Sequence, residues 1–302
     1  MEVLITGGLG FVGTQLSIRL LKRGHQVTVV DRSPEPGPHA PRQVKYVSAD
    51  TTVQGPWQDE VARHDAVINL AGASIFRRWD RKTKQLISDS RVLTTGNVVE
   101  AMSRGDRARV LCSTSAVGYY GFRGDEELSE DDSPGTDFLS QVCIDWEDEA
   151  KKAADLGARV VVTRFGIVLG KTGGALGQMI PAFKRFAGGP LGSGKQWFSW
   201  IHMADLVNAF TFVFDNEDIH GPVNVCSPNP IRNKDLAKAL GATLSRPSFM
   251  KTPAFMLRLV LGEFGAVLLE GQKVFPTKLL KHGFDFRHPD IKEALEDLLG
   301  EG

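Results

Sequence analysis

The sequence has only three cysteines, and its 302 residues carry no excess of charge of either sign. Cys112, Cys143 and Cys226 lie far apart, so they match neither a disulfide framework nor the paired spacing of a zinc site, and we expect no metal centre. Lys plus Arg and Asp plus Glu both number 36, whereas a nucleic-acid surface normally appears as an excess of base. These absences argue against a secreted disulfide scaffold and against a nucleic-acid partner, and they indicate a reduced, cytoplasmic setting.

Long apolar runs are also missing. The amino terminus, MEVLITGG, enters a strand at once, without the basic and apolar regions of a signal peptide. The most apolar late stretch, residues 253–271, is broken by Arg258 and Glu263, so it falls short of the roughly 18 uninterrupted apolar residues of a membrane span. We therefore expect no membrane association, and we expect this stretch to form a pair of core-facing helices.

Short β-branched strands alternate with amphipathic helices from residue 1 to about residue 170. The strand EVLITG is followed by a helix from Phe11 to Arg23 that Gly24 ends, and then by the strand QVTVVD. A long helix capped by Asp80, the strand RVLCSTS, a helix from Asp137 to Gly157 and the strand ARVVVTRFG continue the pattern. Such alternation predicts an α/β fold, a Rossmann-type doubly wound parallel sheet with helices on both faces.

A glycine-rich turn joins the first strand to the first helix. Gly7 permits the tight turn, Gly10 lets the backbone approach a pyrophosphate, and Gly13 allows the helix to pack closely on the strand. Phe11 and Val12 open the helix, whose amino terminus offers unpaired N–H donors and a partial positive charge. A strand before this turn and a helix after it predict a dinucleotide-binding site.

The second strand ends in Asp31 and Arg32, which favour different cofactors. A carboxylate accepts hydrogen bonds from an adenosine ribose and repels a 2′-phosphate, which favours NAD(H), whereas a guanidinium holds that phosphate, which favours NADP(H). A surface Asp-Arg pair in a turn is the alternative interpretation.

The composition changes after residue 170, where glycine and proline gather. The tail is mostly helical, with helices expected near Asn233 to Leu240, Ala254 to Leu261 and Asp290 to Leu299. We predict two domains. Residues 1–170, with parts of 200–228, form the NAD(P)-binding Rossmann domain, and residues 171–302 form a small, mainly helical carboxyl-terminal lobe that covers the cofactor and substrate cleft.

Three motifs in order, Thr6 to Gly13, Asn69 to Gly72 and Ser113 to Gly121, resemble those of the extended short-chain dehydrogenases/reductases. The resemblance narrows to an atypical subfamily described as NAD-dependent epimerase/dehydratase-like, or TIGR-type epimerase family protein. The narrower match rests on RRWDRKTKQLISDSRV, GGPLGSGKQWFSWIHMADL, GEFGAVLLEG and GQKVFPTKLLKHGFDF, so it covers nearly the whole chain.

The resemblance implies that Leu70, Ala71 and Gly72, at the end of the fourth strand, lie along NAD(P)(H). Members of the subfamily usually have Ser or Thr where this chain has Asp31, followed by the same arginine, and are associated with NADP(H). Because Arg32 remains, we expect NADP(H) rather than NAD(H).

Enzymes of the extended family carry a Tyr-xxx-Lys pair on the helix after the strand that ends here in Ser115. The tyrosine exchanges a proton with the substrate, and the lysine lowers the tyrosine pKa from about 10. Matching Glu147 to the glutamate that follows this lysine puts Leu139 at the tyrosine position and Cys143 at the lysine position. No tyrosine follows Tyr120 in the chain, so the pair has not slipped along the helix.

The remaining catalytic candidates are Ser115, Tyr119, Tyr120 and His202. The hydroxyl of Ser115 could bond a substrate oxygen or only satisfy a strand end, and the two tyrosines could reach the same pocket or be core aromatics. Without a cation nearby, a tyrosine stays protonated at neutral pH and donates a hydrogen bond rather than acting as a base. His202 could titrate on the substrate side or be a packed imidazole at a helix start.

Three further residues are candidates for substrate binding. Arg164 could bind an anionic group or simply pair with an acid, and Gln196 and Trp197 are expected to line the pocket beside a glycine loop. Cys143 is disfavoured as a nucleophile, because neither burial nor the acidic residues nearby lower a thiol pKa.

Two functions remain open. The leading hypothesis is an NAD(P)(H)-binding, epimerase-like oxidoreductase that acts on an unknown carbonyl or alcohol. The alternative is a non-catalytic dinucleotide-binding regulatory protein whose carboxyl-terminal lobe contacts a protein partner.

Overall fold

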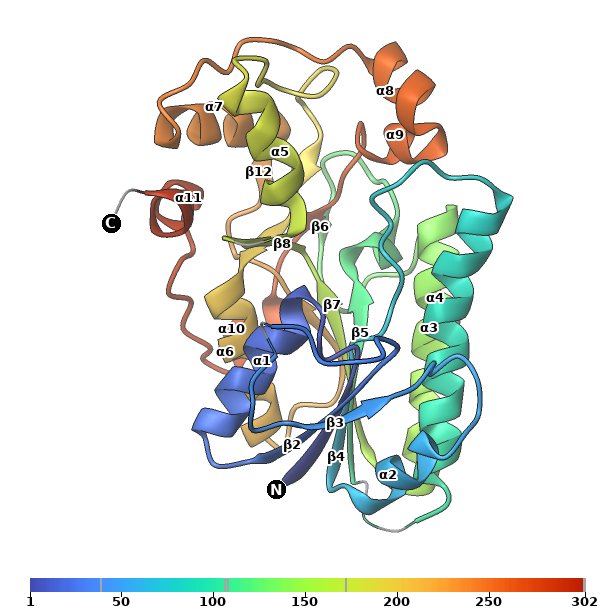
Figure 1. Ribbon diagram of the computed structural model, residues 1–302. Helices are drawn as coiled ribbons and strands as arrows, with labels where there is room; N and C mark the ends of the chain where they lie inside the picture. The colour runs from blue at the N-terminus through green and yellow to red at the C-terminus, as the bar shows by residue number, and fades with distance from the viewer. Residues whose placement is uncertain (39, 106, 108, 172, 301–302) are drawn as a thin grey trace.

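A seven-stranded sheet forms the centre of the molecule in the computed structural model, which describes residues 1–38, 40–105, 107, 109–171 and 173–300. All its strand pairs are parallel, in the order β11-β7-β5-β4-β1-β2-β3 (Figure 1). The strands are β1 (Glu2–Thr6), β2 (Gln26–Asp31), β3 (Lys45–Ser48), β4 (Ala66–Asn69), β5 (Val110–Ala116), β7 (Arg159–Phe165) and β11 (Gly221–Val225). The order reverses between β1 and β4, which is where ligands bind in such sheets. The predicted Rossmann-type sheet is confirmed.

Helices cover both faces of the sheet. Helices α1 (Phe11–Lys22) and α6 (Met203–Asp215) pack on one face, and α2 (Trp57–Arg63), α3 (Arg81–Met102) and α4 (Phe138–Lys151) pack on the other (Figure 1). The buried side chains of β1 and β2 divide between the two cores, as alternate residues of a strand must. Because α6 and β11 belong to these layers, segments after residue 200 complete the sheet domain.

The expected caps are present, and one helix ends earlier than expected. Asp80 accepts from the backbone N–H of Thr83, and Asp137 accepts from those of Leu139 and Ser140. Helix α4 ends at Lys151, and the 3-10 helix η2 (Lys152–Leu156) continues to Gly157, whose φ of 77° closes it. The predicted helix therefore exists with a tightened last turn, which is common at helix ends.

The carboxyl-terminal lobe is mostly helical, as predicted. Helices α5 (Gly174–Lys184), α7 (Asn233–Thr243) and α11 (Ile291–Leu299) share a core beyond the carboxyl ends of the strands (Figure 1). The remaining elements are short: β6 (Glu127–Leu128), β8 (Ile167–Gly170), β9 (Trp197–Phe198), β10 (Trp200–His202), β12 (Ile231–Arg232), β13 (Lys273–Val274), η1 (Val117–Tyr120) and α10 (Thr277–Lys281).

The expectation that residues 253–271 form core-facing helices is wrong for α8 (Ala254–Leu261). Only Leu257 of this helix is buried, while Phe255 and Leu259 are 69% and 72% exposed. The helix packs mainly against α9 (Glu263–Val267), and a short helix that is apolar on all sides buries only the stripe that meets its neighbour. Within the described ranges, no helix has the length and apolar character to cross a membrane.

Candidate cofactor and substrate site

The glycine turn after β1 is packed too tightly for side chains at Gly7 and Gly13. Gly7 has a φ of +67°, and a Cβ on it would lie 2.9 Å from the Cα of Ala71. A Cβ on Gly13 would lie 2.6 Å from the carbonyl oxygen of Gly7. These contacts hold the start of α1 against the ends of β1 and β4.

The start of α1 is left open to an anion. Gly10 is its exposed N-cap, with φ −71° and ψ 176°, and it has no side chain to bond the first turn. The first turn also contains no acidic residue. Free N–H groups and the helix dipole favour a phosphate at this end, so the residues present fit the diphosphate of a dinucleotide.

Asp31 and Arg32 do not form an ion pair with each other. The half-buried carboxylate of Asp31 accepts long hydrogen bonds from the backbone N–H groups of Leu9, at 3.3 Å, and Ser33, at 3.4 Å. Arg32 is exposed, and among the described residues no carboxylate lies within ion-pair distance of it. The adenosine end of the expected site therefore offers both groups, and their roles stay predictions.

The segment after β4 lies against the glycine turn. The N–H of Leu70 donates to the carbonyl oxygen of Thr6 at 3.1 Å, and Ala71 touches Gly7. Leu70 and Ala71 are half-buried and Gly72 is exposed. This places all three along the carboxyl edge of the sheet, where the resemblance expects the cofactor.

A buried polar network lies beyond the end of β5. Ser115 donates to Oε1 of Glu147 at 2.7 Å, and Arg164 donates to both oxygens of Glu147, each at 2.8 Å. Arg164 also donates to the hydroxyl of Tyr120 at 2.9 Å, and Tyr120 donates to Oδ1 of Asn224 at 2.7 Å. The side chains of Arg164 and Glu147 are 3% and 1% exposed.

The network limits what three of the candidates can do. Arg164 pairs with an acid, the second of the two alternatives, so it has no free face for a substrate anion. Burial raises the pKa of Tyr120 far above its ordinary value, although Arg164 opposes the shift. Its phenol therefore stays protonated. Ser115 gives its single proton to Glu147, so it presents only lone pairs to a ligand.

Tyr119 is the candidate that the network leaves free. It is half-buried, the guanidinium of Arg164 lies 3.5 Å from its ring centroid, and its ring packs edge-on against Tyr120. Such a cation over the ring face holds the ring in place. Among the described residues its hydroxyl has no hydrogen-bond partner, so Tyr119 remains a hydrogen-bond donor.

The face of α4 that replaces the usual catalytic pair lies over the end of β5. Leu139 packs beside Gly118, and Cys143 is buried with its sulfur 3.9 Å from the carbonyl oxygen of Ala116. Burial raises the pKa of the Cys143 thiol to about 11, and Glu147 adds to the shift. The thiol stays protonated, as the sequence interpretation required.

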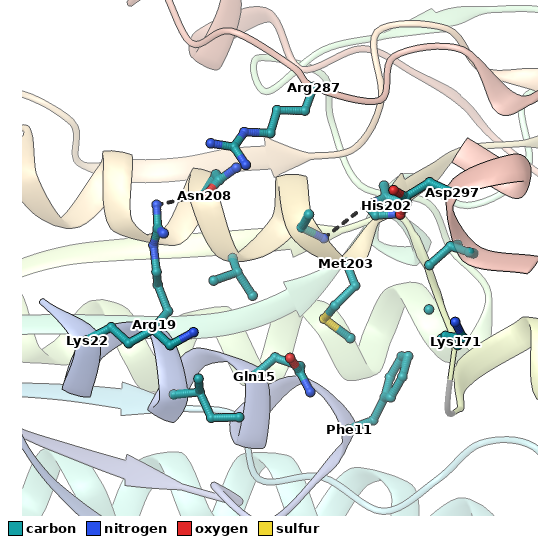
Figure 2. A pocket seen from close by; sticks show the side chains of 15 residues that line it. Phe11, Gln15, Arg19, Lys22, Lys171, His202, Met203, Asn208, Arg287 and Asp297 are labelled. Atoms are coloured by element: carbon teal, nitrogen blue, oxygen red, sulfur yellow. Dashed lines mark hydrogen bonds and ion pairs between the residues drawn. The ribbon is translucent and has the colours of Figure 1, made fainter. Parts of the chain in front are cut away.

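His202 lies in a different pocket (Figure 2). This cavity of about 430 Å³ lies between α1, α6 and α11, and its described lining includes neither Ser115 nor Tyr119. Nδ1 of His202 accepts from the N–H of Ala204 and so caps α6, while Nε2 lies 3.2 Å from Oδ2 of Asp297. The structure does not bring His202 together with the other catalytic candidates, and it favours the packed imidazole.

His202, His288 and Asp297 place possible metal-ligand atoms within 4.8 Å of one another, a cluster that the sequence did not predict. Because Nδ1 of His202 accepts the cap hydrogen bond, the neutral ring carries its proton on Nε2. Nε2 of His202 lies 3.2 Å from Oδ2 of Asp297 but has no hydrogen-bond partner among the described residues.

Gln196 and Trp197 are bonded mainly to other parts of the carboxyl-terminal lobe. The amide of Gln196 donates to the carbonyl oxygens of Leu191 and Leu268. The indole N–H of Trp197 donates to Asp125, and the guanidinium of Arg232 lies 3.8 Å from its ring. These contacts tie the glycine loop to α9 and β12, and a role in substrate binding stays a prediction.

Two residues of this region were not predicted from the sequence. Glu147 served only to align the helix, yet it is the acid that Arg164 and Ser115 share. Its position beside Trp146 on the buried face of α4 was a usable signal, because a buried acid needs a partner. Arg91, on α3, carried no such signal, and the structure brings its guanidinium to Gly72 and Trp146.

Comparison with known proteins agrees with this geometry. The model of the NAD dependent epimerase/dehydratase family matches residues 3–226, and that of a domain of unknown function, DUF1731, matches residues 252–298. The chain is 41% identical over 302 residues to the chloroplastic "Epimerase family protein SDR39U1 homolog" of Arabidopsis thaliana, covering 99% of this chain and 87% of that protein. It is 40% identical over 300 residues to "Epimerase family protein SH2119" of Staphylococcus haemolyticus, covering 99% of both. The crystal structure of human epimerase family protein SDR39U1 (isoform 2) with NADPH superposes with a TM-score of 0.86 and 34% identity, covering 99% of both chains.

Proposed function

We propose, from the premise that the chain belongs to the NAD dependent epimerase/dehydratase family, that it is an NADP(H)-binding oxidoreductase that acts on a carbonyl or alcohol. The observation that carries the proposal is the open amino terminus of α1 behind a turn in which Gly7 and Gly13 leave no room for side chains. This arrangement supports binding of a dinucleotide diphosphate.

Two observations support NADP(H) over NAD(H). Arg32 is exposed at the end of β2, where a guanidinium reaches a 2′-phosphate. The human relative with 34% identity was solved with NADPH. Asp31 opposes this preference, because its charge repels the same phosphate.

The nicotinamide ring, when bound, would supply or accept a hydride at the carboxyl ends of β4 and β5. Ser115 would accept a hydrogen bond from a substrate hydroxyl, because the hydroxyl proton of Ser115 is already donated to Glu147. Tyr119 would donate to a substrate oxygen from η1. Among the described residues, Tyr119 has no lysine beside it that would make it a strong base at neutral pH. We therefore expect slow turnover.

The test is a screen of carbonyl and alcohol substrates that follows the absorbance of reduced nicotinamide. A matched variant combines Gly10→Val, which fills the approach to the diphosphate, with Ser115→Ala. We expect cofactor-dependent turnover in the unmodified protein that exceeds that of the double variant. Equal turnover in both, across a broad panel, would remove the enzymatic proposal.

A second candidate function is cofactor-dependent contact with a protein partner. The observation that favours it is the exposed apolar face of α8, where Phe255, Leu259 and Val260 are more than half exposed, since patches of this kind often mark interaction sites. Pull-downs with and without NADPH would discriminate. Identical partners in both conditions would count against it.

The cellular setting is also a proposal. All three cysteines are free and buried, which supports a reducing compartment such as the cytoplasm. Fractionation of cells that produce the tagged protein would test this.

A further inference from the structure

Arg91 places its guanidinium at the carboxyl edge of the sheet, and no carboxylate of the described residues lies within ion-pair distance of it. Its carbon Cζ would lie 3.1 Å from a Cβ built on Gly72, so it lies against the backbone at the end of β4. It also lies 5.3 Å from the centroid of the Trp146 ring on α4. The side chain thus bridges the segment after β4 and the helix after β5.

The hydrogen bonds of Arg91 are mostly unused. Among the described residues it donates only to the carbonyl oxygen of Ile87, at 2.9 Å, and no carboxylate lies within ion-pair distance. A guanidinium has five N–H donors, so several remain for a ligand. Burial lowers the pKa of Arg91, with Cys143 opposing the shift, yet arginine remains charged at any physiological pH.

A second unpartnered donor lies in the same place. Trp146 is 5% exposed, and within the described ranges its indole Nε1–H has no hydrogen-bond partner. Buried donors are normally paired, and an unpaired one needs an explanation. A half-buried cation beside a buried, unpaired N–H is the environment that an oxygen-rich anion satisfies.

We propose that Arg91 binds a carboxylate or phosphate group of the substrate, so that the substrate is an anionic carbonyl or alcohol. This inference rests on the proposed function and names the substrate class. A planar guanidinium holds either anion through two parallel hydrogen bonds. Trp146 favours the substrate over the cofactor diphosphate as the source of the anion, whereas Gly72, the other neighbour, lies where the cofactor is expected. Cys143 and Trp146 follow β5, whereas the diphosphate turn follows β1, two strands away in the sheet order.

A titration with small anions tests the role of Arg91 without a known substrate. Inorganic phosphate and malonate would be added to the protein saturated with NADPH, and tryptophan fluorescence would report binding. Trp146→Phe identifies the contribution of Trp146 to the signal. We expect saturable binding in the unmodified protein that weakens about tenfold or more in Arg91→Gln and less in Arg91→Lys, which keeps the charge. Arg81→Gln, which removes an exposed arginine at the start of the same helix, should leave binding unchanged.

A cofactor titration separates the two sources of the anion. We expect the Kd for NADPH and for 2′,5′-ADP to change less than about threefold in Arg91→Gln. If Arg91→Gln instead weakens NADPH strongly while leaving 2′,5′-ADP unchanged, the guanidinium serves the cofactor and the substrate inference is overturned.

The remaining outcomes are also decisive. Anion binding that is absent in the unmodified protein, or that is lost equally in Arg81→Gln, overturns the inference. If Arg91→Gln unfolds, Arg91→Lys carries the comparison, because the fork of two hydrogen bonds is lost while the charge stays. If the cofactor titration shows that the unmodified protein does not bind NADPH, that result counts against the proposed function and not against the role of Arg91.

Discussion

Replacing Glu147 by Gln should destabilise the protein strongly. Gln has nearly the same size, but it removes the charge that faces Arg164, which is 3% exposed and donates two hydrogen bonds of 2.8 Å to Glu147. Removing one partner of a buried ion pair leaves the other charge buried and uncompensated, which costs about 3–5 kcal/mol. The cation–π contact with Tyr119 and the bond to Tyr120 remain, so we expect the lower half of this range.

The assay is urea unfolding without cofactor, followed by circular dichroism. Asp148→Asn is the matched control on the same helix, because Asp148 forms only an exposed ion pair with Lys151, which contributes little to stability. The double variant Glu147→Leu with Arg164→Met should recover much of the loss, since neither charge of the pair remains. If Glu147→Gln lowers the free energy of unfolding no more than Asp148→Asn does, the buried Arg164–Glu147 pair does not stabilise the fold.

The other predictions concern the cofactor and one histidine. Arg32→Gln should weaken NADPH binding by about 10-fold to 100-fold, the equivalent of one or two charge-assisted hydrogen bonds, and leave NADH binding unchanged. Asp31→Ser should strengthen NADPH binding. Isothermal titration calorimetry measures both affinities, and parallel changes in NADH affinity would contradict the assignment of these residues to the 2′-phosphate. Gly13→Ala should abolish NADPH binding, because its Cβ would lie 2.6 Å from the carbonyl oxygen of Gly7. Gly177→Ala, with nothing within 4 Å of the new Cβ, should bind NADPH normally. Equal NADPH binding in both variants would refute the close packing at Gly13. Burial lowers the pKa of His202 from 6.5, and His288 adds to the shift. The unfolded chain therefore takes up the proton first, and stability should fall as pH drops below about 6.5. His202→Asn keeps an N-cap and should flatten this fall in urea unfolding at several pH values, whereas an unchanged pH profile would refute the role of His202.

The fold was predictable from the sequence because its signals are local. Apolar strands, the glycine turn and the caps at Asp80 and Asp137 each act within a few residues, and each appears in the structure where expected. Helix α8 was not predictable in the same way. Its apolar residues surround the whole helix, so the sequence shows no polar face from which its orientation could be inferred. Only the structure shows that α9 covers one stripe of it.

The candidate site was only partly predictable, because its decisive contacts join distant segments. The position of Ser115 at the end of β5 follows from the sequence, but its bond to Glu147 crosses to α4, and Arg164 reaches the same acid from β7. His202 shows the same limit. The sequence left open a titrating imidazole or a packed imidazole at a helix start, and only the structure shows that its Nδ1 caps α6.

The charges around α4 indicate what chemistry this site can perform. A tyrosine base needs a cation beside it, but at the end of β5 the guanidinium of Arg164 is already neutralised by Glu147. Arg91 lies beside Trp146, where we propose that it binds the anionic group of the substrate rather than the reacting oxygen. Tyr119, whose hydroxyl has no hydrogen-bond partner among the described residues, is the candidate left to exchange a proton with a substrate oxygen. The same group would give that proton in carbonyl reduction and receive it in alcohol oxidation, so the lack of a tyrosine base slows both directions.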